Sequence, residues 1–294
     1  MLALSSHDAL TQKQLKNFGL TESSGLTSVK SAEKFLKKVG IALRYWRAEK
    51  LPLASLYHAA VGSPETPQKE KNAFGTSLRE ESQRIAIELT NHLLACHQGI
   101  EVNVIAGRIS LVHRDLAPSL CVLVRRHRSP MNLDDISAEA KKVFQFIEKK
   151  QETTAGEVRK FLGKPARDLN NDPAYNALAE LQSKLLIDRG PFLVRKTGIP
   201  YLSKEGYPYH CFHQAHEDLV KVATKLARDE AAQNFLHGYL RGAVFATDKK
   251  LLSMFKEFFT AAELNDALEH LKKLNKISIE DVKRDRLIVA KSGK

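Results

Sequence analysis

Cysteine is scarce in this sequence, and no long hydrophobic run is present. The three cysteines, Cys96, Cys121 and Cys211, are odd in number and far apart in the 294 residues. Such spacing argues against a disulfide framework and is typical of reduced thiols in the cytoplasm. No apolar run reaches the length that spans a bilayer, and the first residues lack the basic segment and apolar core of a secretory signal. We therefore expect a cytoplasmic protein that does not enter a membrane.

Recognisable catalytic and metal-binding motifs are also missing. No G-x-S-x-G turn accompanies a possible Ser/His/Asp set. The segment "YHCFHQAH" places four possible soft-metal ligands close together: His210, Cys211, His213 and His216. Neighbouring residues of a strand point to opposite faces, so the four cannot converge without a bend, and no second Cys/His pair follows at finger spacing. The sequence predicts no catalytic residue, no metal ligand and no cofactor.

Positive charge is abundant. The formal net charge is +12 and the pI is about 9.5, so polyanions should be attracted through counterion release. Lys and Arg crowd into three stretches, residues 30–50, 125–128 and 282–287, rather than spreading evenly. This distribution favours a nucleic-acid partner, with an ordinary basic enzyme as the alternative.

Apolar periodicity and turn residues divide the chain into a lead-in and three similar units. The prediction is a lead-in over 1–30, with a helix near 11–18, and units at 31–128, 137–215 and 216–294. Each unit should hold a helix, a short helix, a long helix and a β-hairpin.

Particular residues mark the expected helix ends. Ser31, Ser137, Thr154 and Thr260 are expected N-caps, and Gly62, Gly99 and Gly163 are expected to end helices. The hairpins are expected in "VNVIAGRISLVH", which turns at Ala106-Gly107, in "FLVRKTG" after Gly190-Pro191, and in "ISIEDVKRDRLIVA". The predicted fold class is mainly α with small β-hairpins (α+β), in tandem winged helix-turn-helix units. One all-helical bundle formed by the long helices is the alternative.

Several segments resemble a known family. "AEKFLKKVGIALRYWRAEKLPLASLYHAAVG", "GRISLVHRDLAPSL", "TTAGEVRKFLG" and "ALAELQSKLLIDRG" are similar to bacterial winged-helix proteins related to the AlkZ-type DNA glycosylases. The resemblance implies a tandem winged-helix scaffold in a DNA-associated protein. In the glycosylases it implies a catalytic Gln-x-Gln or Gln-x-Asp motif in the first winged-helix region. Gln12 and Gln14 have this spacing, but they precede the first unit, and we interpret them as a solvated helix face.

Charge placement suggests how DNA would be held. The long helices carry Glu180, Glu263, Asp266 and Glu269, and carboxylates meet phosphates unfavourably. Basic residues gather instead on the hairpins and their flanks. The candidate DNA-binding residues are Arg108, Arg114, Arg125, Arg126, Arg195, Lys196, Lys283, Arg284 and Arg286.

The functional prediction is therefore a protein that binds double-stranded DNA mainly through phosphate contacts of basic wings, in repair or transcription regulation. Two alternatives stay open: a DNA glycosylase acting on alkylated or crosslinked bases, and a winged-helix module that binds proteins through its acidic helices. The sequence leaves open the DNA target and the oligomeric state.

Overall fold

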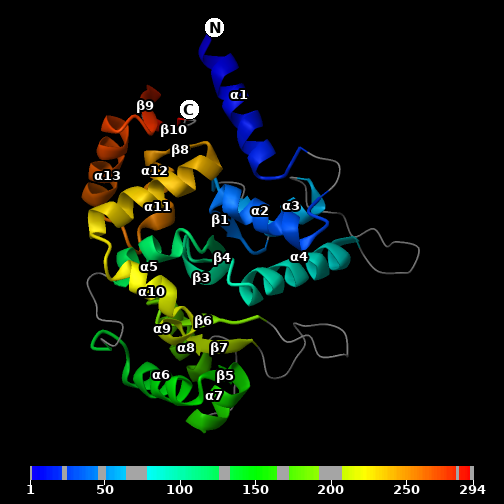
Figure 1. The fold of residues 1–294 in the computed structure, drawn as a ribbon, viewed down its shortest axis with the longest axis vertical. Coiled ribbons are helices and arrows are strands. Elements are labelled where there is room, and N and C mark those ends of the chain that lie inside the picture. The colour runs from blue at the N-terminus through cyan, green and yellow to red at the C-terminus, as the bar shows by residue number, and fades with distance from the viewer. Residues whose placement is uncertain are drawn as a thin grey trace.

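The computed structural model describes residues 2–21, 25–45, 51–63, 78–125, 133–163, 172–191, 207–282 and 285–291; of residues 2–6 and 78–82 it describes only the backbone. The fold is α+β, with many helices and three small sheets (Figure 1). Among the described helices, none combines the length and the apolar character needed to cross a bilayer.

The first unit follows a long amino-terminal helix, α1 (Leu2–Asn17). Its sheet has the order β2-β1-β4-β3, in which β1 pairs parallel with β2 and antiparallel with β4. The elements of the unit are α2 (Val29–Val39), β1 (Ile41–Leu43), β2 (Ala54–Ser55), α3 (Leu56–Val61), α4 (Leu78–Ala95), β3 (Gly99–Ile105) and β4 (Arg108–His113).

The second unit follows a connecting helix, α5 (Ala117–Arg125), and its antiparallel sheet has the order β5-β7-β6. Its elements are α6 (Ala138–Lys150), β5 (Glu152–Thr154), α7 (Ala155–Leu162), α8 (Pro173–Ser183), β6 (Ile187–Arg189) and β7 (Pro208–Cys211). The expected hairpin segment "FLVRKTG" lies outside the described residues.

Two short helices, α9 (Phe212–Ala215) and α10 (Glu217–Ala223), lead into the third unit. Its antiparallel sheet has the order β8-β10-β9. The elements are α11 (Arg228–Ala243), β8 (Phe245–Thr247), α12 (Asp248–Phe255), α13 (Ala261–Lys273), β9 (Ile277–Val282) and β10 (Asp285–Ala290).

One order of elements therefore recurs in the three units: helix, strand, helix, helix, strand, strand. The first unit adds one short strand, β2, before its second helix. In each sheet the first strand pairs with the last one, as β1 does with β4, β5 with β7 and β8 with β10. The three sheets contradict the alternative of one all-helical bundle. The first strands of the units have only three residues each and were not expected, because so short a segment shows no alternation.

Local signals set most helix ends. Ser137, Thr154 and Thr260 accept N-cap hydrogen bonds as expected, and Gly163 ends α7 with φ of 63°. The expected N-cap at Ser31 is wrong, because Ser28 caps α2 and Ser31 completes a reciprocal capping box from the N3 position.

The expected turn between β3 and β4 is confirmed. Ala106 and Gly107 have φ of 51° and 62°, the left-handed values that let a two-residue turn match the twist of its strands. Strand β3 pairs with β4 from Gly99 to Ile105, so Arg108 directly follows the tip of the hairpin. The hairpin thus presents Arg108 at its tip.

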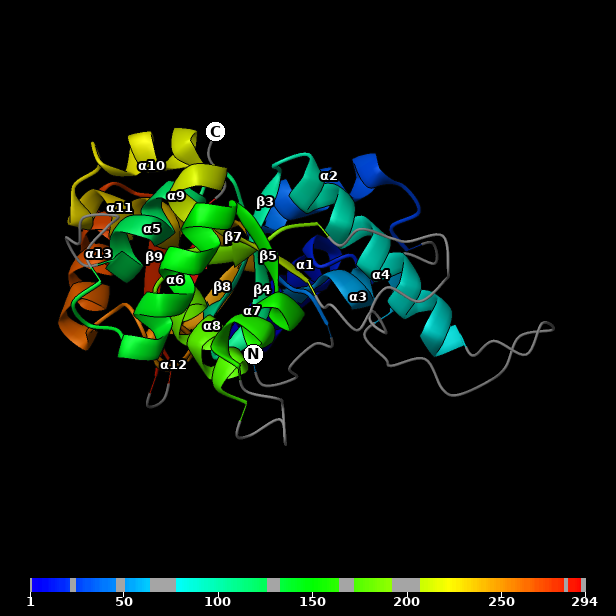
Figure 2. The ribbon, with the colours of Figure 1, turned by 90° about the horizontal axis from the view of Figure 1, so that it is seen from below.

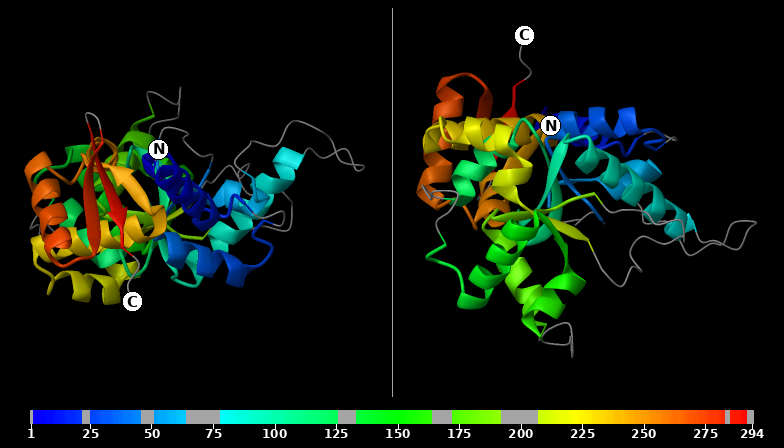
Figure 3. Two further views of the ribbon diagram at one scale, coloured as in Figure 1. Left: turned by 90° about the horizontal axis from the view of Figure 1, so that it is seen from above. Right: turned by 60° about the horizontal axis from the view of Figure 1, so that its bottom comes forward.

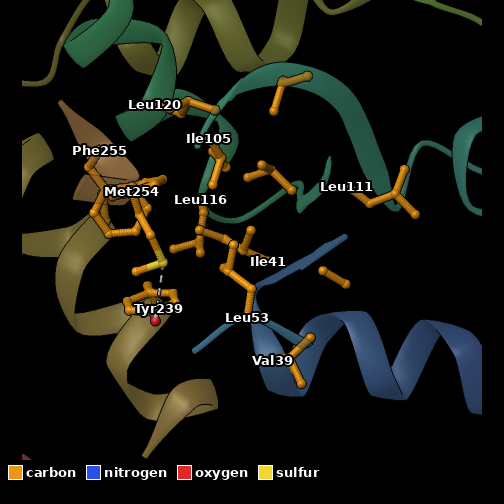
Figure 4. Close-up of a cluster of buried hydrophobic side chains, with 14 of the residues drawn as sticks. Val39, Ile41, Leu53, Ile105, Leu111, Leu116, Leu120, Tyr239, Met254 and Phe255 are labelled. Atoms are coloured by element: carbon orange, nitrogen blue, oxygen red, sulfur yellow. Dashed lines mark hydrogen bonds between the residues drawn. The ribbon is translucent and has the colours of Figure 1, made fainter. Parts of the chain in front are cut away.

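Hydrophobic burial groups the three units into two bodies. One core contains residues from both the first and third units, whereas the second unit has its own core built around Val143, Phe144 and Leu181. Figure 4 shows Ile41 and Leu53 of the first unit beside Tyr239 and Met254 of the third in the shared core.

The close packing of α2 on α11 requires a glycine at position 242 of α11. A Cβ added to Gly242 would lie 2.3 Å from the carbonyl oxygen of Val39, so any side chain would push the two helices apart. Figures 1 and 3 show the first and third units side by side, with the second unit beneath them. The domain boundaries at 31–128, 137–215 and 216–294 remain predictions, and the shared core ties the first of these units to the third.

Candidate nucleic-acid interface and a buried arginine–glutamate site

The structure describes four of the nine candidate DNA-binding residues. Arg108 is exposed at the tip of the β3–β4 hairpin. The other three described residues, Arg114, Arg125 and Arg286, all contact protein groups. Arg126, Arg195, Lys196, Lys283 and Arg284 lie outside the described residues. These four arginines do not form one basic cluster. The segments outside the described residues carry more Lys and Arg than Asp and Glu.

Arg114 and Arg286 already have carboxylate partners. An Nη atom of Arg114 lies 2.7 Å from the Asp218 carboxylate, and both side chains are well exposed. Arg286 donates from Nε to Asp248 at 3.0 Å and also approaches Glu269 at 3.7 Å. Partial burial raises the pKa of Asp248, but hydrogen bonds from Arg286 and a backbone N–H outweigh it and lower the pKa. A DNA phosphate would have to compete with these carboxylates.

Arg125 is a structural residue rather than a surface cation. It is only 6% exposed, donates a hydrogen bond to the carbonyl oxygen of Leu185, and lies over the ring of Phe212 at 5.1 Å. Burial lowers the pKa of its guanidinium. The expected phosphate contact of Arg125 does not agree with this placement, because α5 turns this arginine inward against the second unit.

The sequence-based interpretation of the two glutamines also changes. Gln12 is exposed, but Gln14 is 7% exposed, and its amide donates to the carbonyl oxygens of Ala243 and Phe245 at 2.5 and 3.2 Å. The interpretation of both glutamines as a solvated face is therefore wrong for Gln14, which fastens α1 to the end of α11.

The segment "YHCFHQAH" forms separate contacts rather than one ligand set. His210 approaches Glu152 at 3.7 Å, His213 approaches Glu148 at 3.6 Å, and His216 lies 2.6 Å from Asp188. Chain geometry explains the separation, since the segment begins in strand β7 and continues into helix α9.

A buried charged cluster lies where the first and second units meet, and none of its residues was predicted from the sequence. We call Arg44, Glu101, Arg189 and Tyr207 the arginine–glutamate site. Arg44 directly follows β1, Glu101 lies within β3, and Arg189 ends β6. Strands β3 and β6 contact each other where the second unit meets the first (Figure 1). Figure 2, seen from below, has helices α6, α7 and α8 of the second unit toward the viewer.

One carboxylate serves both arginines of this site. Glu101 accepts from an Nη atom of Arg44 at 2.6 Å and from one of Arg189 at 3.1 Å, and its side chain is 1% exposed. The other Nη of Arg44 lies 2.5 Å from the hydroxyl oxygen of Tyr207. The Tyr207 ring also faces both guanidinium groups, with centroids 4.7 and 5.1 Å away.

The site carries one net positive charge, because two guanidinium groups share a single carboxylate. Burial opposes the charge on Arg44 and Arg189, but the nearby Glu101 carboxylate outweighs it and raises the pKa of both. Burial also raises the pKa of Tyr207 to about 12, so its hydroxyl keeps its proton near neutral pH. The Nε atoms of both arginines are buried without a hydrogen-bond partner among the described residues. The buried N–H groups and the net positive charge suit the binding of a hydrogen-bond acceptor or an anion.

A pocket of about 180 Å³ opens beside Arg44. The rings of Tyr45 and Tyr57 line it together with Ala86 and Ile87, and Gln83 adds an amide. A lining that is mostly apolar with a few polar groups is common in small-molecule sites. The sequence signal was present but weak: a glutamate inside the apolar strand "GIEVNVI" and an arginine directly after the apolar "IAL".

Fold and site together define a class: an α+β chain of three like units with a buried charged site between the first two. No family model and no curated protein matches the chain. Among solved structures, the fold is similar to that of the DNA glycosylase AlkZ from Streptomyces sahachiroi, with a TM-score of 0.54 and 12% identity. The match covers 94% of this chain and 67% of that one. At this identity the likeness concerns the fold alone.

Proposed function

We propose that this chain is a DNA-binding protein built from three winged helix-turn-helix units, which contacts duplex DNA mainly at its phosphates. The observation that carries the proposal is the fold likeness to a DNA glycosylase over 94% of the chain. The recurrent element order supports the winged-helix interpretation, since a third helix followed by a hairpin is the arrangement such units use. We place its action in the bacterial cytoplasm, in DNA repair or transcription regulation.

Basic hairpin residues are the proposed phosphate contacts. Arg108 is exposed at a hairpin tip and is the strongest described candidate. Arg195, Lys196, Lys283 and Arg284 belong to the two segments expected to form the other hairpins. Phosphate contacts position a protein on DNA without reading its sequence, so this mode predicts affinity with little base preference.

Acidic residues on the long helices have structural roles that fit this mode. Glu180 on α8 accepts from the backbone N–H and the hydroxyl of Ser137, at 2.8 and 2.7 Å. Glu263 on α13 closes the capping box with Thr260 and binds Arg228 at 2.7 Å. These carboxylates therefore stabilise neighbouring helix ends. The alternative of a protein-interaction module rests on the acidic helices, and internal contacts account for these two glutamates.

The test is a titration of fluorescently labelled duplex DNA at several salt concentrations. Log affinity should fall with log salt at a slope of about −0.9 per phosphate contact. Changing Arg108, Arg195, Lys196, Lys283 and Arg284 to Ala should flatten the slope and weaken unrelated sequences equally, whereas Lys142→Ala on α6 should not. Absence of binding at low salt would overturn the proposal and favour the protein-interaction alternative.

DNA glycosylase activity is the second candidate, and the pocket beside Arg44 favours it. An enzyme that acts on a base must take the base out of the stack and hold it between flat side chains. Tyr45 and Tyr57 could do this, with the Arg44 guanidinium next to the base. Product analysis on alkylated and crosslinked duplexes tests this candidate: base release that is lost on Tyr45→Ala would support it, and intact duplex with wild-type protein would refute it.

A further inference from the structure

Three side chains with metal-binding atoms converge on the outer side of the first unit. Glu33 lies on α2, His92 lies in the last turn of α4, and Cys96 directly follows that helix. One ligand atom from each lies within 4.8 Å of the others, and the described residues contain no other such group of three. His92 and Cys96 are four residues apart, so they share one helical face.

The hydrogen bonds within the cluster orient the imidazole. Nε2 of His92 lies 2.9 Å from a carboxylate oxygen of Glu33, and Nδ1 lies 3.8 Å from the sulfur of Cys96. A carboxylate that accepts Nε2–H favours the tautomer whose lone pair is on Nδ1. That lone pair then faces the sulfur, which is the arrangement of a histidine ligand with a carboxylate behind it.

The distance between the two donor atoms fits one ion. Zinc lies about 2.3 Å from a thiolate and about 2.0–2.1 Å from an imidazole nitrogen. With donor atoms 3.8 Å apart, one ion can contact both at an angle of roughly 120°, which is close to tetrahedral.

We propose that Cys96 Sγ and His92 Nδ1 bind a divalent transition-metal ion of the zinc type, with Glu33 positioning the imidazole. Binding releases the thiol proton of Cys96 to solvent, so the thiolate and the Glu33 carboxylate together balance the two charges of the ion. Calcium and magnesium are excluded as occupants because they require oxygen ligands. Cys96 is exposed, so water completes the coordination and the ion exchanges readily.

Co²⁺ is the probe, because cobalt bound to a thiolate absorbs in the near ultraviolet. Titrating the full chain with Co²⁺ should produce this band with one ion per chain, and Zn²⁺ should abolish it by displacement. Cys96→Ser should remove the band, and Glu33→Gln should weaken binding about tenfold through loss of the positioning contact. His97→Asn, at an exposed neighbouring position, is the matched control and should bind normally.

Circular dichroism should show that all three variants keep the helical content of the wild type, so that a lost band reports the site and not the fold. The proposal is overturned if saturating Co²⁺ gives no thiolate band, or if the band persists in Cys96→Ser. DNA binding does not enter this measurement, so its outcome is independent of the proposed function.

Discussion

Replacing Glu101 by Gln should cost more stability than any other single charge removal described above. The isosteric amide keeps the shape but leaves two buried guanidinium groups without a counter-charge. Breaking a buried ion pair by removing one partner costs about 3–5 kcal/mol. Glu101 is 1% exposed and serves both Arg44 and Arg189, so we expect a loss of about 4 kcal/mol in the free energy of unfolding.

Arg44→Met should cost less, about 2 kcal/mol, because Glu101 then keeps Arg189 as its partner. The two effects should be coupled, so the double variant Glu101→Met with Arg44→Met should lose less stability than the sum of its single variants. Urea unfolding followed by circular dichroism measures all of these. Glu88→Gln is the control, since this exposed pair with Arg84 is worth at most about 0.5 kcal/mol. A Glu101→Gln variant as stable as Glu88→Gln would refute the argument.

Three further predictions concern other parts of the molecule. Gln14→Ala should lower the free energy of unfolding in urea by about 2 kcal/mol, through loss of two buried hydrogen bonds, whereas Gln12→Ala should change nothing. A hydrogen bond from an arginine of α11 lowers the pKa of Glu263 to about 2, so its ionised form stabilises the fold above the ordinary glutamate pKa of about 4.3. That contribution should disappear as the pH falls toward 2. In this range the urea midpoint of Glu263→Gln should therefore depend less on pH than that of the wild type, whereas the exposed control Glu230→Gln should behave like the wild type. Thiol titration with a chromogenic disulfide should detect one fast cysteine, Cys96, in the native chain and three in urea, because the other two cysteines are buried; three fast thiols in native protein would contradict this burial.

Features governed by neighbouring residues could be predicted from the sequence. Caps at Ser137, Thr154 and Thr260 and the turn at Ala106-Gly107 depend on side chains and φ values within a few residues. The wrong N-cap at Ser31 is also a local matter. Ser28 and Ser31 both suit the start of a helix, and only their hydrogen bonds show that Ser28 is the cap and Ser31 the N3 residue.

Features that depend on distant partners could not be predicted. The placements of Gln14 and Arg125 follow from carbonyl groups 229 and 60 residues away along the chain. Glu101 is a charge within an apolar strand, and its partners Arg44 and Arg189 come from the end of β1 and from β6. A single sequence shows that a charge interrupts a buried pattern, and only the fold shows which charge compensates it.

The shared core of the first and third units separates the order of synthesis from the order of folding. The hydroxyl of Tyr239 donates to the carbonyl oxygen of Pro52 across 187 residues, and the amide of Gln14 spans 229. Contacts of such separation are slow to form, and the first unit must wait for α11 to leave the ribosome before its apolar surface is covered. The second unit has its own core and can close while the rest is still being made. A nascent chain of this protein should therefore fold from its middle, and the face of α2 that packs on α11 stays uncovered until α11 emerges.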